Sequence, residues 1–423
     1  MNEIHTDVAI LGAGSAGCTA ALAASRLGVK TAIIDRLGFP GGTSTAVLDT
    51  FYAFFTAGEN GRKIVSGLPD LPVERLSLRG AVRARPNSFG SGTGYTYDPE
   101  MLKIVWAQLL SEHKVNVFLH TLVVDTETDG DRITSVLLAG KGGLIRLYAH
   151  TFIDATGDAD VVERAGGEML QDTELNQPAT LTFRVSPVDF ERYRESGRPN
   201  MRHLVQTARE AGFKLPGSGG SLHESGVPGT ALTALVRVDS PDLNDPAESG
   251  RMEMEALLQA DEWFRFLQGW VPGFEKARFS AIATMTGVRE TRRIEGRHIL
   301  TEDEVVEGMR FKDPIALCGA PIEDLSDEST RWRHVGGSGI YGIPWRSLVP
   351  VRLKGVVVAG RCLSATHAAH ASARSMGTCM AMGQAAGTAS AIAVIDGQSV
   401  DEIAYAKLRS QLVQDGVILE EYS

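Results

Sequence analysis

Two histidines and an arginine lie close together in the stretch THAAHASARSMGTCMAMGQAAG, residues 366–387. His367 and His370 can move protons near neutral pH, and Arg374 can bind an anion through its N–H groups. On a helix, their spacing would place the two histidines on one face. A metal site would need a third ligand, which this stretch lacks, so we predict no metal. The stretch is a candidate for acid–base chemistry on a substrate. The alternatives are buried, hydrogen-bonded histidines and a structural ion pair for the arginine.

Two other segments carry residues that could complete such a site. In MTGVRETRRIEG, Arg292 and Arg293 lie among glutamates and are expected to form ion pairs, whereas Arg289 follows small residues and is expected to reach the pocket. In GIYGIPWRSLVP, Tyr341 and Arg346 are predicted to form one wall. A pocket lined with arginines favours an anionic or strongly polar substrate.

A glycine-rich turn near the N-terminus has the spacing of a dinucleotide-binding site. Gly12, Gly14 and Gly17 form G-x-G-x-x-G between an apolar run and a helical pattern. Gly12 permits the tight turn, Gly14 admits a pyrophosphate, and Gly17 lets helix and strand pack closely. Asp35 ends the next apolar run, where a ribose-binding acid is expected. Since the start of a helix offers free N–H groups to phosphate, the predicted phosphate-binding residues are Gly12, Gly14, Ser15, Ala16 and Gly17.

The surrounding pattern supplies a framework for this turn. Apolar runs predict buried strands at 8–11 and 30–34, before Asp154, and within LKGVVVAGRC, while further strands flank the DGD turn at 129–131. Helices are predicted at 20–27, 98–113 and 251–269. A closing helix is predicted in SVDEIAYAKLRSQLVQDG, with capping-box spacing between Ser399 and Glu402.

Composition narrows the class of protein. The 423 residues carry a net charge of −10, which argues against nucleic acid as the main partner. None of the four cysteines forms a CxxC pair, so a redox dithiol, a zinc knuckle and an iron–sulfur cluster lack ligands. Reduced thiols and the lack of a secretory signal predict a cytoplasmic protein. The apolar run at 381–395 is expected to be too short to span a membrane.

Four segments together resemble a known family. The resemblance lies at residues 6–44, 117–167, 282–298 and 340–393. In chain order, these segments contain GAGSAG and PGGTS, FIDATGD, the arginine-rich stretch, and VVVAGRC…GQAAG. The chain resembles FAD-dependent oxidoreductases with a glutathione-reductase-type Rossmann domain, and most closely the branch of fumarate reductase and succinate dehydrogenase flavoproteins. The resemblance implies non-covalently bound FAD and an α/β fold, with a Rossmann-type domain around a parallel sheet and a discontinuous α+β substrate domain.

The resemblance also implies roles along the cofactor. Asp35 would hold the adenosine ribose, Arg36 would lie beside the adenine, and the backbone of Val124 would pair with it. One departure concerns Arg361, since this branch usually has an acid there that binds a ribityl hydroxyl; an arginine paired with a surface acid is the alternative. The other implied contacts are Gly42, Thr43 and Ser44 along the flavin, Ala155, Thr156 and Gly157 along the ADP part, and Gly360 and Arg361 by the ribityl chain.

For the opening stretch, the resemblance implies a helix aimed at the flavin. Gly377 and Thr378 would start that helix at the pyrimidine edge, and Gly383 would let it lie close to the cofactor. Arg374 would face the substrate side of the ring. His367 would lie over the flavin face.

The resemblance implies an enzyme that transfers a hydride between a small polar or anionic substrate and flavin N5, as a dehydrogenase, oxidase or desaturase. A flavin-dependent monooxygenase and a non-redox FAD-containing binding or assembly protein are the alternatives. The chain has no second strand–G-x-G-x-x-G–helix, so the electron acceptor stays open among oxygen, a quinone, a carrier protein and transient nicotinamide. The predicted FAD-binding domain comprises 1–44, 96–168 and 340–423, and the substrate domain comprises 45–95 and 169–339.

Overall fold

A five-stranded parallel sheet lies at the centre of the fold. The computed structural model describes residues 2–58, 61–86, 92–171, 177–196, 200–217, 219–239, 243–325 and 331–420. The strands pair in the order β7-β3-β2-β11-β20. This is the 3-2-1-4-5 order of dinucleotide-binding folds, so the predicted α/β class is confirmed. The bounds are Val8–Leu11 (β2), Thr31–Ile34 (β3), Asn116–Phe118 (β7), Thr151–Asp154 (β11) and Val356–Val358 (β20).

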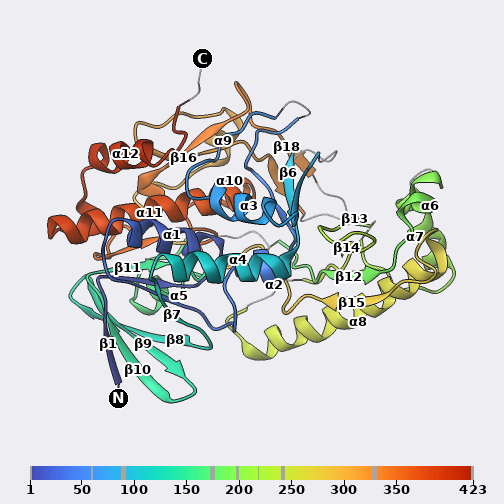
Figure 1. The fold of residues 1–423 in the computed structure, drawn as a ribbon, viewed down its shortest axis with the longest axis horizontal. Helices are drawn as coiled ribbons and strands as arrows, with labels where there is room; N and C mark the ends of the chain where they lie inside the picture. The colour runs from blue at the N-terminus through green and yellow to red at the C-terminus, as the bar shows by residue number, and fades with distance from the viewer. Residues whose placement is uncertain are drawn as a thin grey trace.

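Two helices pack against each other beside this sheet. Helices α1 (Ser15–Arg26) and α11 (Met376–Asp396) run side by side (Figure 1). A Cβ added to Gly383 would lie 2.1 Å from the carbonyl oxygen of Ala16, and one added to Gly387 would lie 2.2 Å from that of Ala20. The close approach that Gly383 permits is therefore to α1, which corrects the expectation that this glycine lets α11 lie close to the cofactor.

Helix α11 is the one described helix long and apolar enough to cross a membrane, with a hydropathy of 1.3 over its best window. However, 89% of that window is buried inside the protein. Small side chains let α11 pack on all sides, so it is a core helix. It is longer than the apolar run that the sequence suggested.

A second sheet and several short elements surround the central sheet. The second sheet has the order β1-β10-β9-β8, and β8 and β9 flank the predicted DGD turn. Its strands are Asn2–His5 (β1), Leu122–Asp129 (β8), Arg132–Gly140 (β9) and Gly143–Tyr148 (β10). The short strands are Thr50–Phe51 (β4), Val82–Arg85 (β5), Gly94–Tyr97 (β6), Pro314–Cys318 (β16), Ile322–Asp324 (β17), Arg331–Arg333 (β18) and Tyr341–Pro344 (β19). The remaining helices of this part are Thr43–Ala46 (α2), Asp70–Ser77 (α3), Pro99–Glu112 (α4), Asp160–Arg164 (α5), Glu302–Val306 (α9), His367–Ala373 (α10) and Tyr405–Gln414 (α12), with 3-10 turns at Trp345–Leu348 (η1) and Val400–Glu402 (η2).

A separate antiparallel sheet builds the cap, seen at the right of Figure 1. Its order is β13-β14-β12-β15, and its buried apolar residues form a second core, distinct from that of the central sheet. The fully buried residues of this core lie between 179 and 277, and Ala283 and Val288 pack against them. Residues 51–81 and 294–343, which the prediction divides between the two domains, contribute buried residues to the first core. Its elements are Phe183–Ser186 (β12), Ser221–Glu224 (β13), Ala231–Ala234 (β14), Arg278–Ile282 (β15), Phe190–Glu195 (α6), Met201–Glu210 (α7) and Pro246–Trp270 (α8).

The predicted C-terminal capping box is wrong. Ser399 donates its hydroxyl hydrogen to the carboxylate of Asp401, and the chain forms the 3-10 turn η2 before α12 begins at Tyr405. Asp401 is buried and pairs with Arg297 at 2.8 Å, so tertiary contacts outweigh the local capping signal here.

Candidate active site

The glycine turn forms an open cradle at the start of α1. Gly12 has φ +107°, and a Cβ there would lie 2.3 Å from the carbonyl oxygen of Ala155. A Cβ on Gly17 would lie 1.8 Å from the carbonyl oxygen of Gly12. At Gly14, by contrast, a Cβ would meet nothing within 4 Å. The buried hydroxyl of Ser15, in the first turn of α1, has no hydrogen-bond partner among the described residues. Open space and a free hydroxyl at a helix N-terminus fit a bound phosphate.

Asp35 stabilises this turn from the end of β3. Its carboxylate accepts hydrogen bonds from the backbone N–H of Ala13 at 2.6 Å and of Leu37 at 2.8 Å. Burial raises the pKa of Asp35, and the two hydrogen bonds oppose that rise. The acid predicted for ribose binding therefore also fixes the shape of the phosphate turn.

The two residues predicted near adenine differ in burial, because Arg36 is exposed and Val124 is half-buried. Arg36 is exposed, and its Nη2 lies 3.1 Å from the sulfur of Met285. Val124 lies in a β-bulge, because the β8–β9 register passes from Val123 to Asp125. A bulge leaves a residue out of the strand ladder, so the backbone of Val124 suits a ligand contact.

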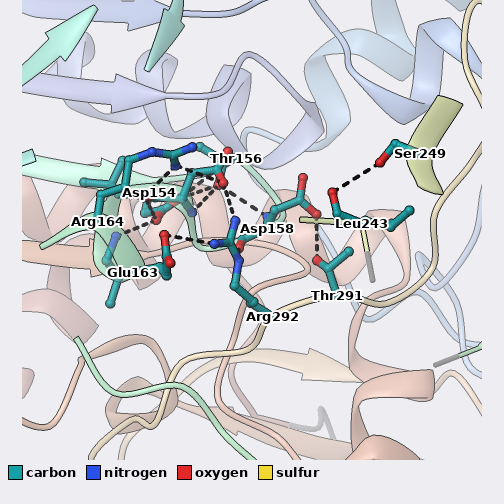
Figure 2. A network of polar contacts seen from close by, with 12 residues as sticks. Asp154, Thr156, Asp158, Glu163, Arg164, Leu243, Ser249, Thr291 and Arg292 are labelled. Carbon is teal, nitrogen blue, oxygen red and sulfur yellow. Dashed lines mark hydrogen bonds and ion pairs between the residues drawn. The ribbon is translucent and has the colours of Figure 1, made fainter. Parts of the chain in front are cut away.

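The FIDATGD segment is held by a buried aspartate that sequence reasoning did not assign. Asp154 accepts a hydrogen bond from the hydroxyl of Thr156 at 2.7 Å (Figure 2). It also accepts hydrogen bonds from the backbone N–H groups of Val161 and Val162. Burial is the largest influence on Asp154 and raises its pKa. Asp154 thereby fixes the Ala155–Gly157 loop beside Gly12.

Arg361 forms an ion pair, as its alternative interpretation proposed. Its guanidinium donates to Asp158 at 2.7 Å, and the hydroxyl of Thr291 donates to the same carboxylate oxygen at 2.6 Å. Burial would raise the pKa of Asp158, but Arg361 and Thr291 outweigh it and lower the pKa. A Cβ on Gly157 would lie 3.0 Å from the Arg361 guanidinium, and one on Gly360 3.1 Å from Ala16, so both glycines allow close packing at this junction. Figure 2 shows the contact between Asp158 and Thr291.

The Gly42–Ser44 segment lies directly on the phosphate turn. The N–H of Gly41 donates to the carbonyl of Ala13 at 2.7 Å, and a Cβ on Gly42 would lie 2.8 Å from the Cα of Gly14. Thr43 and Ser44 then form the first turn of the short helix α2. The structure thus brings this predicted flavin-lining segment to the predicted phosphate site.

His367 is held by a buried glutamate. Its Nδ1 lies 2.8 Å from the carboxylate of Glu290, whose side chain is only 1% exposed. Glu290 also pairs with Arg293 at 3.2 Å. Because a carboxylate only accepts hydrogen bonds, Nδ1 of His367 carries the hydrogen in this contact. The sequence indicated Glu290 only as a partner for Arg292 and Arg293; Arg292 instead pairs with Asp160 and Glu163.

His370 has the contacts of a structural residue. It is fully buried, and its Nε2 donates to the carbonyl of Arg361 at 2.7 Å. Burial, followed by the charges of Arg374 and Arg293, lowers its pKa well below the usual value. His370 is therefore neutral at physiological pH. Its buried Nδ1 has no hydrogen-bond partner among the described residues, so the alternative of a buried, satisfied histidine is met at Nε2 only.

Arg374 and Arg289 meet in the interior, together with a glutamine. Arg374 donates to the side-chain oxygen of Gln177 at 2.8 Å and to the backbone carbonyl of Arg289 at 3.2 Å. Arg289 donates to the carbonyl of Pro178 and the hydroxyl of Thr180. Burial lowers the pKa of Arg374 to about 10, and it also lowers that of Arg289. Desolvated guanidinium groups bind anions strongly.

Tyr341 does not form a pocket wall. It is fully buried, and its hydroxyl lies 2.8 Å from that of Ser372 on α10. Burial raises its pKa well above the usual value. Arg346, its predicted companion, is half-exposed and pairs with Asp313. All four residues of β19 are buried, so Tyr341 lies in the core, which sequence spacing did not reveal.

The start of α11 packs against residues 52 and 53. The N–H of Gly377 donates to the carbonyl of Tyr52 at 2.9 Å, and a Cβ on Gly377 would lie 2.8 Å from that oxygen. Thr378 is fully buried, and its hydroxyl lies 3.3 Å from the sulfur of Cys318. Both residues lie in the first turn of α11, as predicted. Gly377 contacts Tyr52 and Thr378 contacts Cys318.

The parallel sheet, its strand order and the open glycine turn define a dinucleotide-binding α/β protein. The chain matches the family model described as FAD dependent oxidoreductase over residues 7–412, and it belongs to that family. It is therefore an FAD-dependent oxidoreductase, and the predicted cofactor and enzyme class are confirmed.

Solved structures resemble this chain over nearly its whole length. A geranylgeranyl bacteriochlorophyll reductase-like protein from Thermoplasma acidophilum is 13% identical, with a TM-score of 0.52 over 98% of this chain and 84% of that one. The p-nitrophenol 4-monooxygenase of Pseudomonas putida DLL-E4 is 13% identical, with a TM-score of 0.45 over 99% and 85%. The Mycobacterium smegmatis Sdh1 complex in the apo form is 16% identical, with a TM-score of 0.46 over 97% and 72%. The first of these shows a shared fold.

The residues present fit FAD. The open space at Gly14, the unpartnered hydroxyl of Ser15 and the bulge at Val124 leave places for a pyrophosphate and a base along one path. Among the described residues, no group of three or more His, Cys, Asp or Glu side chains could hold a metal ion.

Proposed function

We propose that this FAD-dependent oxidoreductase transfers a hydride between flavin N5 and a small anionic or polar substrate. Arg374, supported by Arg289, would bind the anionic group, and His367 would move the proton. The single observation that supports this proposal most is the pair of Glu290 and His367. Gln177 links this pair to Arg374, because the backbone N–H of Gln177 donates to Glu290 and the side-chain oxygen of Gln177 accepts from Arg374. Bound FAD would supply the two-electron chemistry.

The arrangement has a clear chemical division of roles. Glu290 orients the imidazole of His367 through Nδ1. An imidazole held in this way suits removal of a substrate proton during dehydrogenation or its return during reduction. A negatively charged substrate would stabilise the guanidinium of Arg374, because its positive charge is largely desolvated.

The four cysteines are free and buried, which supports the predicted cytoplasm as the compartment.

Anaerobic flavin bleaching tests the proposal. A panel of small carboxylic, hydroxy and amino acids is mixed with the FAD-loaded protein, and reduction is followed at the flavin absorption band. For any substrate found, Arg374→Ala and His367→Asn should each slow reduction by roughly 10- to 100-fold while FAD content stays unchanged. Loss of flavin from Arg374→Ala with a normal reduction rate per bound FAD would instead make Arg374 a cofactor ligand.

A further inference from the structure

Two buried hydrogen-bond donors beside Arg374 have no acceptor. Among the described residues, neither Nε of Arg374 nor Nε2 of Gln177 has a hydrogen-bond partner, although both atoms are shielded from solvent. Gln177 is only 1% exposed. Buried donors are almost always paired in folded proteins, so two on adjacent side chains point to a ligand that supplies the acceptors.

The orientation of the Gln177 amide is fixed by its neighbours. An arginine only donates hydrogen bonds, so the oxygen of Gln177 must face Arg374, and the 2.8 Å contact between Oε1 and Nη2 has this arrangement. The NH₂ group of the amide is therefore the free end. The backbone N–H of Gln177 donates to Glu290 at 3.2 Å, which anchors the residue between Arg374 and the Glu290–His367 pair.

We infer that Gln177 is a further substrate-binding residue, whose amide N–H and the Nε–H of Arg374 together bind the oxygens of one carboxylate group on the substrate. The inference rests on the proposed function, because it places the substrate anion at Arg374. A carboxylate offers two acceptor oxygens and a negative charge, so it satisfies both donors and the guanidinium at once. A ligand without an acceptor would leave both donors unpaired.

Two substitutions at Gln177 separate binding from positioning. Gln177→Glu keeps an oxygen for Arg374 but replaces the N–H donor with a second carboxylate oxygen, so Arg374 stays in place while a carboxylate ligand is repelled. Gln177→Leu removes both groups. Gln206→Leu is the matched control, because Gln206 is exposed on α7 and bonds only to Glu210 at 3.1 Å among the described contacts.

Acetate, malonate and benzoate are titrated into the FAD-loaded protein, and the change in flavin absorption gives a dissociation constant for each. At least one should bind saturably to the wild type. Gln177→Glu and Gln177→Leu should weaken that carboxylate by about 10-fold or more, while Gln206→Leu stays within twofold of wild type. FAD content should be equal in all variants.

Three results would overturn the inference. The first is wild-type affinity in Gln177→Glu, which would make Gln177 a positioning residue for Arg374. The second is loss of FAD from Gln177→Leu, which would assign the donors to the cofactor. The third is absence of saturable binding by all three carboxylates. An Arg374→Ala variant distinguishes the proposals: if it binds carboxylate normally, the proposed function fails; if it alone loses binding, only the role of Gln177 fails.

Discussion

Replacing Gly14 and Gly17 by alanine should separate cofactor binding from folding within a single turn. At Gly14 an added Cβ meets no protein atom within 4 Å, and the backbone φ of −69° suits alanine. At Gly17 it would lie 1.8 Å from the carbonyl oxygen of Gly12, and backbone cannot move aside as a flexible side chain can. The two added methyl groups therefore meet different surroundings, which are open space at Gly14 and backbone at Gly17.

The expected sizes follow from these contacts. Gly17→Ala overpacks a strand–helix junction, which typically costs about 1–3 kcal/mol of unfolding free energy. Gly14→Ala should change apoprotein stability by less than about 1 kcal/mol, because two effects oppose each other. Alanine is a poorer N-cap residue than glycine, but it also lowers the conformational entropy of the unfolded chain. Its methyl group would enter the space predicted for pyrophosphate, and losing one or two backbone contacts to a charged phosphate should weaken FAD by roughly 10- to 100-fold.

Two measurements on purified apoprotein check this. Urea unfolding gives the stability of each variant, and fluorescence quenching of added FAD gives its dissociation constant. Wild-type FAD affinity in a folded Gly14→Ala protein would refute the placement of the dinucleotide. Wild-type stability in Gly17→Ala would refute the packing of the turn.

The remaining predictions concern neighbouring contacts. Gly383→Val should lower the unfolding temperature, because its side chain would displace the backbone of α1 at Ala16; differential scanning calorimetry would show it, and an unchanged melting temperature with lost FAD would restore the cofactor role. A double-mutant cycle with Arg361→Ala and Asp158→Asn should give a coupling energy of about 1 kcal/mol, and no coupling would contradict the pair. His370 has a folded pKa well below its reference value of 6.5, so the unfolded chain binds the extra proton and stability should fall as pH drops below 6.5, by at most about 1.4 kcal/mol per unit. His370→Gln should flatten that slope in urea titrations between pH 5 and 7.5, and an equally steep slope would argue against a buried neutral histidine. Acid precipitation should release the flavin, whereas flavin retained on the pellet would show covalent attachment.

The central sheet could be predicted because its signals are local. Strands buried on both faces give continuous apolar runs, such as Val8–Leu11 and Val356–Val358. The glycine turn could be predicted because a side chain at these positions would clash with backbone only a few residues away, as at Gly17. The family resemblance added the cofactor, which spacing alone left open between FAD and NAD.

The candidate site was harder to predict because it joins distant segments. Gln177 and Arg374 are 197 positions apart, and Glu290 and His367 are 77 apart. No periodicity links such residues, and Gln177 carried no signal of its own. The prediction that Tyr341 lines a pocket was wrong because the sequence around a buried tyrosine bonded to Ser372 looks the same as that around a tyrosine on a pocket wall.

A crystal structure of the FAD-loaded protein with a bound carboxylate would test the placement of cofactor and substrate together. We expect pyrophosphate density at Gly14 and Ser15, and a carboxylate within hydrogen-bond distance of both Arg374 and the Gln177 amide, on the same side of the flavin as His367. Density that places flavin atoms on Arg374 and Gln177, with the carboxylate bound elsewhere, would refute both assignments.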